Sequence, residues 1–319
     1  MVEVEIASFQ VSVIIPVYNA AAYVSQAVES ALAQPETAEV LLIEDGSPDD
    51  ALEVCKELAG KYEKVKLLRH PNGENRGPGA SRNLGMMNAN YEYIAFLDAD
   101  DFYIPYRFSK ASKIFDENPS CEGVYEAVGM LVEDDQSIKR WKESGKIEGG
   151  LTTITKTVSP INLAEELILG YAGYFHIDGW VVKKSVLAKS GYMDETLMLH
   201  QDSHFCVKVA AVSFLYPGQL DQPVAIRRVH ERNRISAPRS QMKQFKDRMK
   251  YWMSLYRWAK NKLGKDKQDL ILRSTINFAR THKYFASFPR NLLPTRLIRF
   301  TRLLRLLAYP EIILDVIKK

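Results

Sequence analysis

Short apolar runs alternate with amphipathic stretches through the first third of the chain. We predict strands at residues 11–17, 39–43, 65–68 and 91–97, and helices at 21–33, 48–59 and 79–88. Strands buried on both faces read as continuous apolar runs, and strand–helix alternation implies right-handed crossovers between parallel strands. The pattern therefore predicts an α/β fold with a Rossmann-like, mostly parallel central sheet flanked by helices.

The pattern changes twice after residue 130. Residues 131–159 are polar and weakly periodic, which predicts an irregular insertion or a hairpin beside the ligand-binding face. Helices and short strands resume from 161 to 228, with a strand at 223–226 and a helix that opens near residue 202. From residue 238 the spacing is helical, which predicts a C-terminal α-helical extension.

Charge separates the two ends of the chain, although the overall net charge is only +4. Residues 239–319 carry 20 Lys and Arg against 5 Asp and Glu, whereas the other 238 residues carry 23 against 34. Such an asymmetry indicates modules with different partners. We therefore predict a first domain at 1–236, with halves at 1–127 and 128–236, and a basic helical extension at 237–319.

Composition adds a few limits. Hydrophobic residues make up 46% of the chain and charged residues 26%, which is ordinary for a soluble globular protein. The three cysteines, Cys55, Cys121 and Cys206, are far apart and in no metal-ligand spacing, which indicates reduced thiols and a cytoplasmic location. No apolar run reaches about 18 residues, so we expect no transmembrane helix.

Four arginines cover one half of a predicted helix near the C-terminus. Arg296, Arg299, Arg302 and Arg305 alternate with leucines and Phe300, which fill most of the opposite half. Such a helix suits an anionic membrane surface, so we predict contact through residues 290–319 and a peripheral location on the inner face of the cell membrane. Packing of the apolar half on the first domain is the alternative. No nucleic-acid-binding motif accompanies the charge, so no nucleic acid partner is predicted, and a homodimer stays open.

Polar motifs occur at the predicted carboxyl ends of the strands. Carboxyl ends of parallel strands meet at one edge, where open α/β sheets bind ligands. Taken alone, each motif also fits an ordinary turn or helix cap. Carboxylates two residues apart can converge on one Mg²⁺ or Mn²⁺ ion, so together the motifs predict a ligand crevice with a metal site. The motifs are Pro16-Val17-Tyr18-Asn19, Glu44-Asp45-Gly46-Ser47, the Gly-rich segment 75–85 with Arg82, and Asp98-Ala99-Asp100-Asp101.

The order of these motifs resembles that of inverting family 2 glycosyltransferases with the GT-A fold, over roughly residues 10–236. The segments 11–19, 44–47 and 79–85 are similar to the opening strand, base-binding acid and Ala-Arg-Asn helix of that family, and 96–101 is similar to its DXD motif. The resemblance implies that Asp45 contacts the base, Asp98 the ribose or the metal, and Asp100 the metal. The donor-binding set that it implies is Pro16, Tyr18, Asn19, Glu44, Asp45, Gly77, Arg82, Asp98, Ala99 and Asp100.

The second half supplies the remaining candidates by the same resemblance. Asp202 matches the catalytic base, although Gln201 stands where the family usually has Glu. His230 matches a histidine that joins Asp98 and Asp100 at the metal, which favours Mn²⁺ over Mg²⁺. Gly179, Trp180 and Gln201 are the predicted acceptor-binding residues, with an exposed Trp180 stacking on a sugar ring. A buried Trp180, an N-cap Asp202 and an uncommitted loop His230 are the structural alternatives.

The resemblance implies transfer of one sugar, with inversion, from a nucleotide-sugar donor that is UDP-linked to a hydroxyl of a glycan or lipid-linked acceptor. Ser254 replaces the Gln of the Gln-x-x-Arg-Trp motif of processive synthases, so we predict a non-processive, metal-dependent enzyme. A nucleotidyltransferase is a rival hypothesis, but residues 19–23 lack the Gly-rich basic loop that it would need. An inactive, glycosyltransferase-like scaffold is the other rival, indicated by Gln201.

Overall fold

The apolar runs of the first third form the centre of a seven-stranded sheet in the computed structural model, which describes residues 9–133, 150–230, 240–281, 309–310 and 312. Its strand order is β3-β2-β1-β4-β8-β6-β9. Strands β1 (Val11–Val17), β2 (Thr37–Glu44), β3 (Val65–Arg69) and β4 (Tyr93–Phe96) are parallel. The mostly parallel central sheet predicted from the sequence is confirmed.

In the second half of this seven-stranded sheet, one strand runs opposite to the others. Strand β8 (Trp180–Lys183) is antiparallel to both β4 and β6 (Gly123–Tyr125), and β9 (Leu215–Pro217) is parallel to β6. A smaller sheet has the order β5-β10-β7, formed by Phe102–Tyr103, Ala225–Val229 and Val128–Val132. The carboxyl end of β10 therefore lies beside that of β7, its parallel neighbour.

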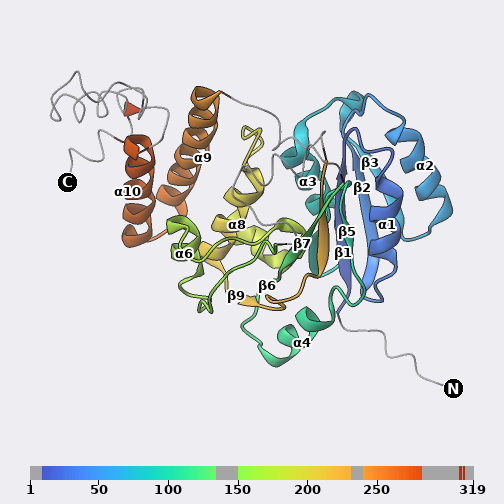
Figure 1. Ribbon diagram of the computed structural model, residues 1–319, viewed down its shortest axis with the longest axis horizontal. Helices are drawn as coiled ribbons and strands as arrows, with labels where there is room; N and C mark the ends of the chain where they lie inside the picture. Colours follow the sequence, from blue (N-terminus) through green and yellow to red (C-terminus); the bar gives the residue numbers. More distant parts are fainter. Residues whose placement is uncertain (1–8, 134–149, 231–239, 282–308, 311, 313–319) are drawn as a thin grey trace. The chain divides into compact units, whose positions relative to one another are not determined.

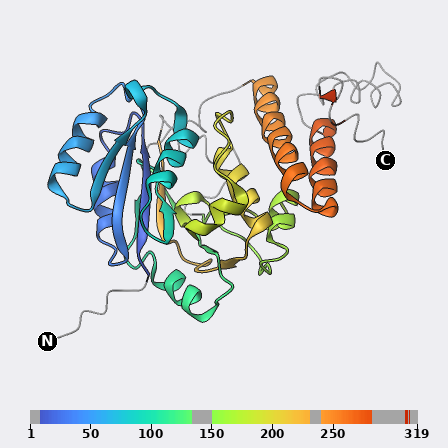
Figure 2. The same ribbon diagram turned by 180° about the vertical axis from the view of Figure 1, so that it is seen from behind.

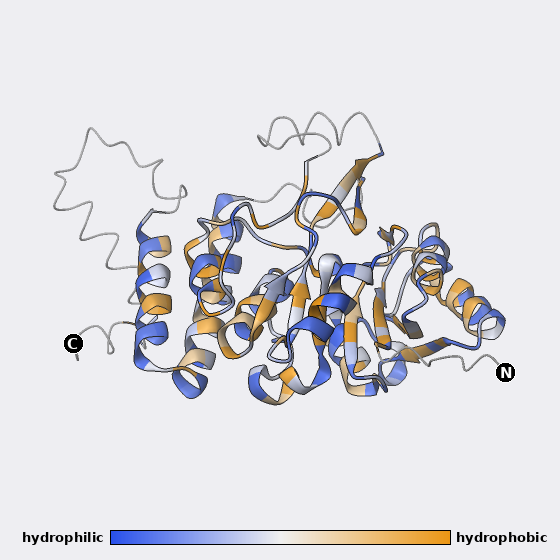
Figure 3. Ribbon diagram, turned by 90° about the horizontal axis from the view of Figure 1, so that it is seen from below, coloured by the Kyte–Doolittle hydropathy of each residue, from blue (hydrophilic) through white to orange (hydrophobic). Residues whose placement is uncertain are grey.

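Helices cover both faces of the parallel strands. Figure 1 shows α1 (Val24–Leu32) and α2 (Ala51–Lys61) on one face and α3 (Gly77–Asn88) on the other, and Figure 2 shows the same layers from behind. The helix ribbons in Figure 3 carry both hydrophilic and hydrophobic residues, as expected for helices that bury one side. Further helices are α4 (Ser109–Glu117), α6 (Leu163–Leu169), α7 (Leu187–Ser190) and α8 (Gln201–Val212), with short 3₁₀ turns at Pro71–Gly73, Ile177–Gly179 and Lys184–Val186.

The core lies between α1, α2 and the parallel strands. Val13, Ile15 and Leu42 are fully buried there, and alternate β1 residues face the other side, where α3 packs. Gly85 allows that packing, because a Cβ atom at Gly85 would lie 2.4 Å from Cγ2 of Ile14. Helix α3 therefore packs closely on β1, and its residue Arg82 reaches the carboxyl end of β4.

The chain divides into two compact units, Met1–Ala237 and Pro238–Lys319. In the second unit, α9 (Gln241–Lys262) and α10 (Lys265–Thr281) form a helical pair in which Phe245 stacks on Phe278 with ring centroids 5.8 Å apart. Ser240 caps α9 by accepting a hydrogen bond from the backbone N–H of Lys243. Among the described residues, no helix is both long and apolar enough to cross a membrane. The predicted amphipathic helix at 290–319 lies almost entirely outside the described residues.

Candidate active site

The site lies where the order of the parallel strands reverses. The chain passes from β1 outward to β2 and β3 and then returns to β4 on the other side of β1, which makes the β1–β4 pair the topological switch point. Ligands bind outside the carboxyl ends of strands at such a point. Asn19, with a φ of 54°, turns the chain after β1, and its N–H donates to Ser47 Oγ at 3.2 Å. Tyr18 beside it is 48% exposed, so its ring is open to a ligand.

Two buried carboxylates shape the loop after β2. Asp45 accepts the backbone N–H groups of Arg76 at 2.7 Å and Gly77 at 2.8 Å, so it holds the N-terminus of α3. Glu44 accepts Arg69 Nε at 2.7 Å and the N–H of Ser47 at 2.5 Å. Both acids are almost fully buried. The structure gives them a supporting role at the carboxyl end of β2, and their predicted donor contacts stay predictions.

Helix α3 delivers a buried guanidinium to the acidic motif. Arg82 is 5% exposed, and its Nη2 donates to Asp98 Oδ1. Nε and Nη1 of Arg82 have no hydrogen-bond partner among the described residues. The helix begins at Gly77, so Arg82 is its sixth residue and lies beyond the first turn. The Gly-rich segment predicted at the edge of the sheet thus brings Arg82 to the acidic motif.

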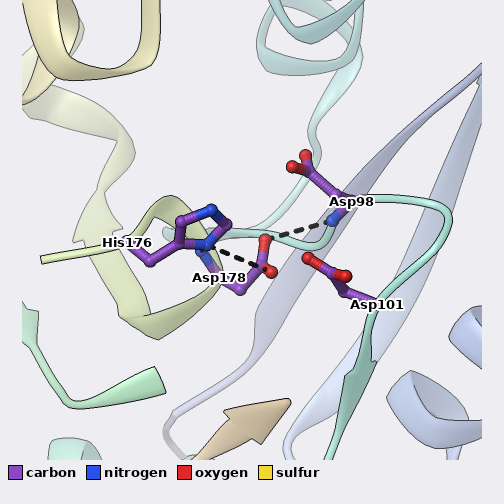
Figure 4. A group of neighbouring side chains, drawn as sticks. All are labelled: Asp98, Asp101, His176 and Asp178. Atoms are coloured by element: carbon purple, nitrogen blue, oxygen red, sulfur yellow. Dashed lines mark hydrogen bonds and ion pairs between the residues drawn. The ribbon is translucent and has the colours of Figure 1, made fainter. Parts of the chain in front are cut away.

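Asp98 belongs to a group of three acids and one histidine that are buried or partly buried. Ligand atoms of Asp98, Asp101, His176 and Asp178 all lie within 4.8 Å of one another. In Figure 4 the carboxylate of Asp101 points toward Asp178, whose Oδ1 accepts the N–H of Asp98 at 3.1 Å. His176 Nδ1 is 3.2 Å from Asp178 Oδ2. Asp101 is thus part of this group, although it was not among the predicted metal-binding residues.

The protonation of this group follows from its burial and its charges. Burial and the nearby carboxylates of Asp178 and Asp100 raise the pKa of Asp101 well above its ordinary value. Burial also acts to raise the pKa of Asp178, but His176 and the hydrogen bonds that Asp178 accepts outweigh it and lower that pKa. The two neighbouring carboxyls are thus pushed in opposite directions, because His176 stabilises the charge of Asp178 and no cation among the described residues does the same for Asp101.

A second contact pair forms at the exposed end of the motif. Asp100 Oδ2 is 3.1 Å from Nε2 of His230, the residue that follows β10. Side chains of Asp98 and Asp100 are each 29% exposed, so both carboxylates reach solvent. The predicted metal-binding set is therefore divided: Asp100 contacts His230, while Asp98 contacts Arg82 and Asp178.

Helix α8 carries the candidate base toward the same guanidinium. Asp202 is the second residue of α8, and its Oδ1 accepts the N–H of Ser203 at 2.7 Å. His200, not Asp202, occupies the N-cap position. Burial acts to raise the pKa of Asp202, but the positive charge of Arg82 and the Ser203 hydrogen bond lower it below its ordinary value. Asp202 is thus an ionised carboxylate at neutral pH, as a general base must be.

The predicted acceptor residues are mostly buried. Trp180 is fully buried and stacks on Phe96, with ring centroids 5.9 Å apart, so the expectation of an exposed ring was wrong. It fills the space between β4 and α8 because its strand lies next to β4 in the sheet. A Cβ at Gly179 would lie 2.4 Å from the carbonyl oxygen of Glu126, which explains the glycine by packing. Gln201 is 7% exposed, and its Oε1 has no partner among the described residues.

Sequence reasoning missed His176 and Asp178 as site residues. Both lie on the segment before β8, which long-range pairing of β8 with β4 brings under Asp98. The buried Arg107 guanidinium fixes that segment, since Nε donates to the Asp178 carbonyl at 3.2 Å and Nη1 pairs with Glu126 at 2.5 Å. The only local signal was a polar His-x-Asp between apolar residues.

A family comparison agrees with this arrangement. The model of a family described as "Glycosyl transferase family 2" matches residues 12–160. The match supports family 2. It covers just under half of the chain, including Asp45, Arg82 and the Asp98–Asp101 motif, whereas Asp202 and His230 lie beyond it.

Curated relatives match part of the chain. An uncharacterized glycosyltransferase of Haemophilus influenzae is 44% identical over 93 residues, which are 29% of this chain and 36% of that protein. The minor teichoic acid biosynthesis protein GgaA of Bacillus subtilis is 27% identical over 201 residues, 61% of this chain and 42% of GgaA. The chain therefore spans less than half of the length of these relatives.

Solved structures share the fold. S. aureus TarS 1–349 in complex with UDP-GlcNAc has a TM-score of 0.65 and 20% identity, covering 88% of this chain and 76% of that chain. The mannosyltransferase PcManGT from Pyrobaculum calidifontis in complex with GDP-Man and Mn²⁺ has a TM-score of 0.51 and 18% identity, covering 94% and 81%. The fold is that of the GT-A glycosyltransferases, as predicted from the sequence.

Proposed function

We propose that the chain is a nucleotide-sugar-dependent glycosyltransferase that transfers one sugar, with inversion, from a UDP-linked donor to a hydroxyl of a glycan or lipid-linked acceptor. One observation carries the proposal: the buried Arg82 guanidinium pairs with Asp98 of the acidic motif, and its positive charge also lowers the pKa of Asp202 on α8. One guanidinium thereby interacts with a candidate donor-binding residue and with the candidate base. The UDP-GlcNAc complex of the TarS neighbour and the polymer-biosynthesis name of GgaA support it.

The donor would lie along the carboxyl ends of β1, β2 and β4. Tyr18 offers an exposed ring for the base, and Asp45 holds the loop and helix start that border the base pocket. The unpartnered N–H groups of Arg82 suit a phosphate oxygen or the Asp202 carboxylate. Asp202 takes the proton of the acceptor hydroxyl as that oxygen attacks the anomeric carbon.

Asp98 and Asp100 would hold a divalent cation, with His230 as the nitrogen donor. Two partly exposed carboxylates and one imidazole suit Mn²⁺ better than Mg²⁺. When bound there, the cation would supply positive charge that stabilises the departing diphosphate. Asp101 and Asp178 support this edge from below, since Asp101 accepts the N–H of Arg228 and Asp178 accepts the N–H of Asp98.

The experiment separates binding from chemistry. A thermal-shift panel of nucleotide sugars, with and without Mn²⁺, identifies the donor, and transfer or hydrolysis is then measured for wild type and Asp202→Asn. Loss of the general base should lower turnover by about 10²–10⁴-fold and leave donor affinity within about twofold. Full turnover in Asp202→Asn, or no stabilisation by any nucleotide sugar, would contradict the proposal. The cytoplasmic location, membrane contact through 290–319 and a homodimer stay predictions.

A further inference from the structure

Tyr23 touches the candidate cation site from the start of α1. It is the residue before Val24, the first residue of the helix. Its ring stacks on the imidazole of His230 with centroids 5.1 Å apart and an interplanar angle of 25°. The other edge of that imidazole is committed to the acidic motif, since Nε2 is 3.1 Å from Asp100 Oδ2. Tyr23 thus packs against the face of a histidine whose nitrogen faces Asp100.

A polar clamp holds the Tyr23 ring in place. Its hydroxyl donates to Glu133 Oε2 at 3.1 Å, and Glu133 Oε1 pairs with Nη1 of Arg228. The Arg228 guanidinium lies 5.3 Å from the centroid of the Tyr23 ring. Arg228 and His230 are two residues apart at the end of β10, so both contact the same ring from one side of the extended chain.

The same clamp reaches the acidic motif through the backbone. Arg228 donates its N–H to Asp101 Oδ1 at 2.7 Å, and its guanidinium also pairs with Gln26 on α1. The end of β10 is therefore fixed both to α1 and to the turn that carries Asp100. With the backbone near His230 held in this way, the His230 side chain can still rotate about its χ angles. The stacked Tyr23 ring restricts that rotation.

We propose that Tyr23 is a positioning residue that holds the His230 imidazole in the plane from which it ligates the cation beside Asp100. The inference rests on the proposed function. Tyr23 is only partly buried and lies outside the hydrophobic core cluster, so a role in core stability does not account for it. Residues that orient a metal ligand typically change metal affinity by about 10–100-fold when they are lost.

The test compares four single variants and one double variant for Mn²⁺-dependent binding of UDP by calorimetry. Tyr23→Leu removes the ring, Tyr23→Phe keeps the ring and removes only the hydroxyl, and His230→Ala removes the ligand. Tyr62→Leu is the matched control. Tyr62 also donates its hydroxyl to a glutamate, Glu29, at 2.9 Å, but Tyr62 lies at the end of α2 and has no contact with His230 among those described. UDP binding is also measured without Mn²⁺.

Tyr23→Leu should weaken Mn²⁺-dependent UDP binding by about tenfold and leave metal-free UDP binding unchanged. Tyr23→Phe should retain most of the affinity, and Tyr62→Leu all of it. In a His230→Ala background, Tyr23→Leu should cause no further loss, because it acts only through that imidazole.

Wild-type affinity in Tyr23→Leu, or additive losses in the double variant, would overturn the inference and leave the proposed function standing. Absence of Mn²⁺–UDP binding in the wild type would instead overturn the proposed function, and this inference with it. Thermal unfolding shows whether each variant folds. If Tyr23→Leu does not fold, the same results are expected for Tyr23→Met, whose unbranched, flexible side chain adapts more easily to the space of the ring and is not aromatic.

Discussion

His204 is a buried imidazole that the fold keeps neutral. Burial and the positive charge of Lys208, one turn further along α8, lower the pKa of His204 from 6.5 to about 3. Between pH 3 and pH 6.5, His204 therefore binds more protons in the unfolded chain than in the folded protein. The contribution of the neutral His204 to the stability of the fold is complete above pH 6.5 and is lost as the pH falls toward 3. The free energy of unfolding should fall by up to about 1.4 kcal/mol per pH unit from this residue alone.

Urea unfolding at pH 5.0, 5.75 and 6.5 checks this prediction in a window above most carboxyl pKa values. His204→Gln cannot take up the proton and should show the shallower pH dependence of the two proteins. Equal slopes for wild type and His204→Gln would show that this imidazole is not kept neutral by the fold.

Single residues also show how far the sequence could predict the site. Asp98, Asp100 and Arg82 were candidates because each lies in a local pattern near a predicted strand or helix end, whereas Asp202 was a candidate only by resemblance to the base of family 2 glycosyltransferases. Asp178 was not, because its position under Asp98 depends on the pairing of β8 with β4, across 80 residues of chain. An aromatic side chain gives no local signal of burial, so the sequence alone could not decide between an exposed and a buried Trp180.

Helix α3 depends on one glycine to approach β1. A Cβ at Gly85 would lie 2.4 Å from Ile14 Cγ2 and 3.0 Å from Ile43 Cδ1, whereas a Cβ at Gly60 on α2 would have no heavy atom within 4 Å. Gly85→Ala should destabilise the protein by about 1–3 kcal/mol and displace α3, which carries Arg82. Gly60→Ala, the matched control, should be stabilising by about 0.5–1 kcal/mol.

Denaturant unfolding of both glycine variants measures this difference. A Gly85→Ala protein as stable as the wild type would mean that α3 does not pack as closely on β1 as the structure has it. If Gly60→Ala lowered the free energy of unfolding, helix propensity would not determine the effect of this substitution on the exposed side of α2.

Whole elements differ in how well the sequence predicts them. Strand β1 was predicted with both of its ends, because a fully buried strand is a continuous apolar run with polar residues at each end. Strands β5, β6 and β9 have only two or three residues, too few for a periodic signal. Helix α3 begins earlier than its pattern suggested, because the Asp45 side chain, distant in sequence, holds Arg76 and Gly77.

At the scale of the whole molecule, charge and structure divide the chain at nearly the same place. The acidic excess belongs to the unit that contains the candidate site, and the basic excess belongs to the unit Pro238–Lys319. Within the first unit, the partly exposed Asp98 and Asp100 lie above the buried carboxyl pair of Asp101 and Asp178. A cation between these carboxylates and the diphosphate of a nucleotide-sugar would offset the repulsion between the two negatively charged groups.

Calorimetric titration of UDP into the wild type and Asp100→Asn, each with and without Mn²⁺, tests this central claim most directly. Asp100→Asn keeps the size of the side chain and removes its charge. We predict that Mn²⁺ strengthens UDP binding to the wild type by at least about tenfold and has little effect on UDP binding to Asp100→Asn. Equal UDP affinities in the two proteins, or wild-type binding that Mn²⁺ does not change, would contradict the account.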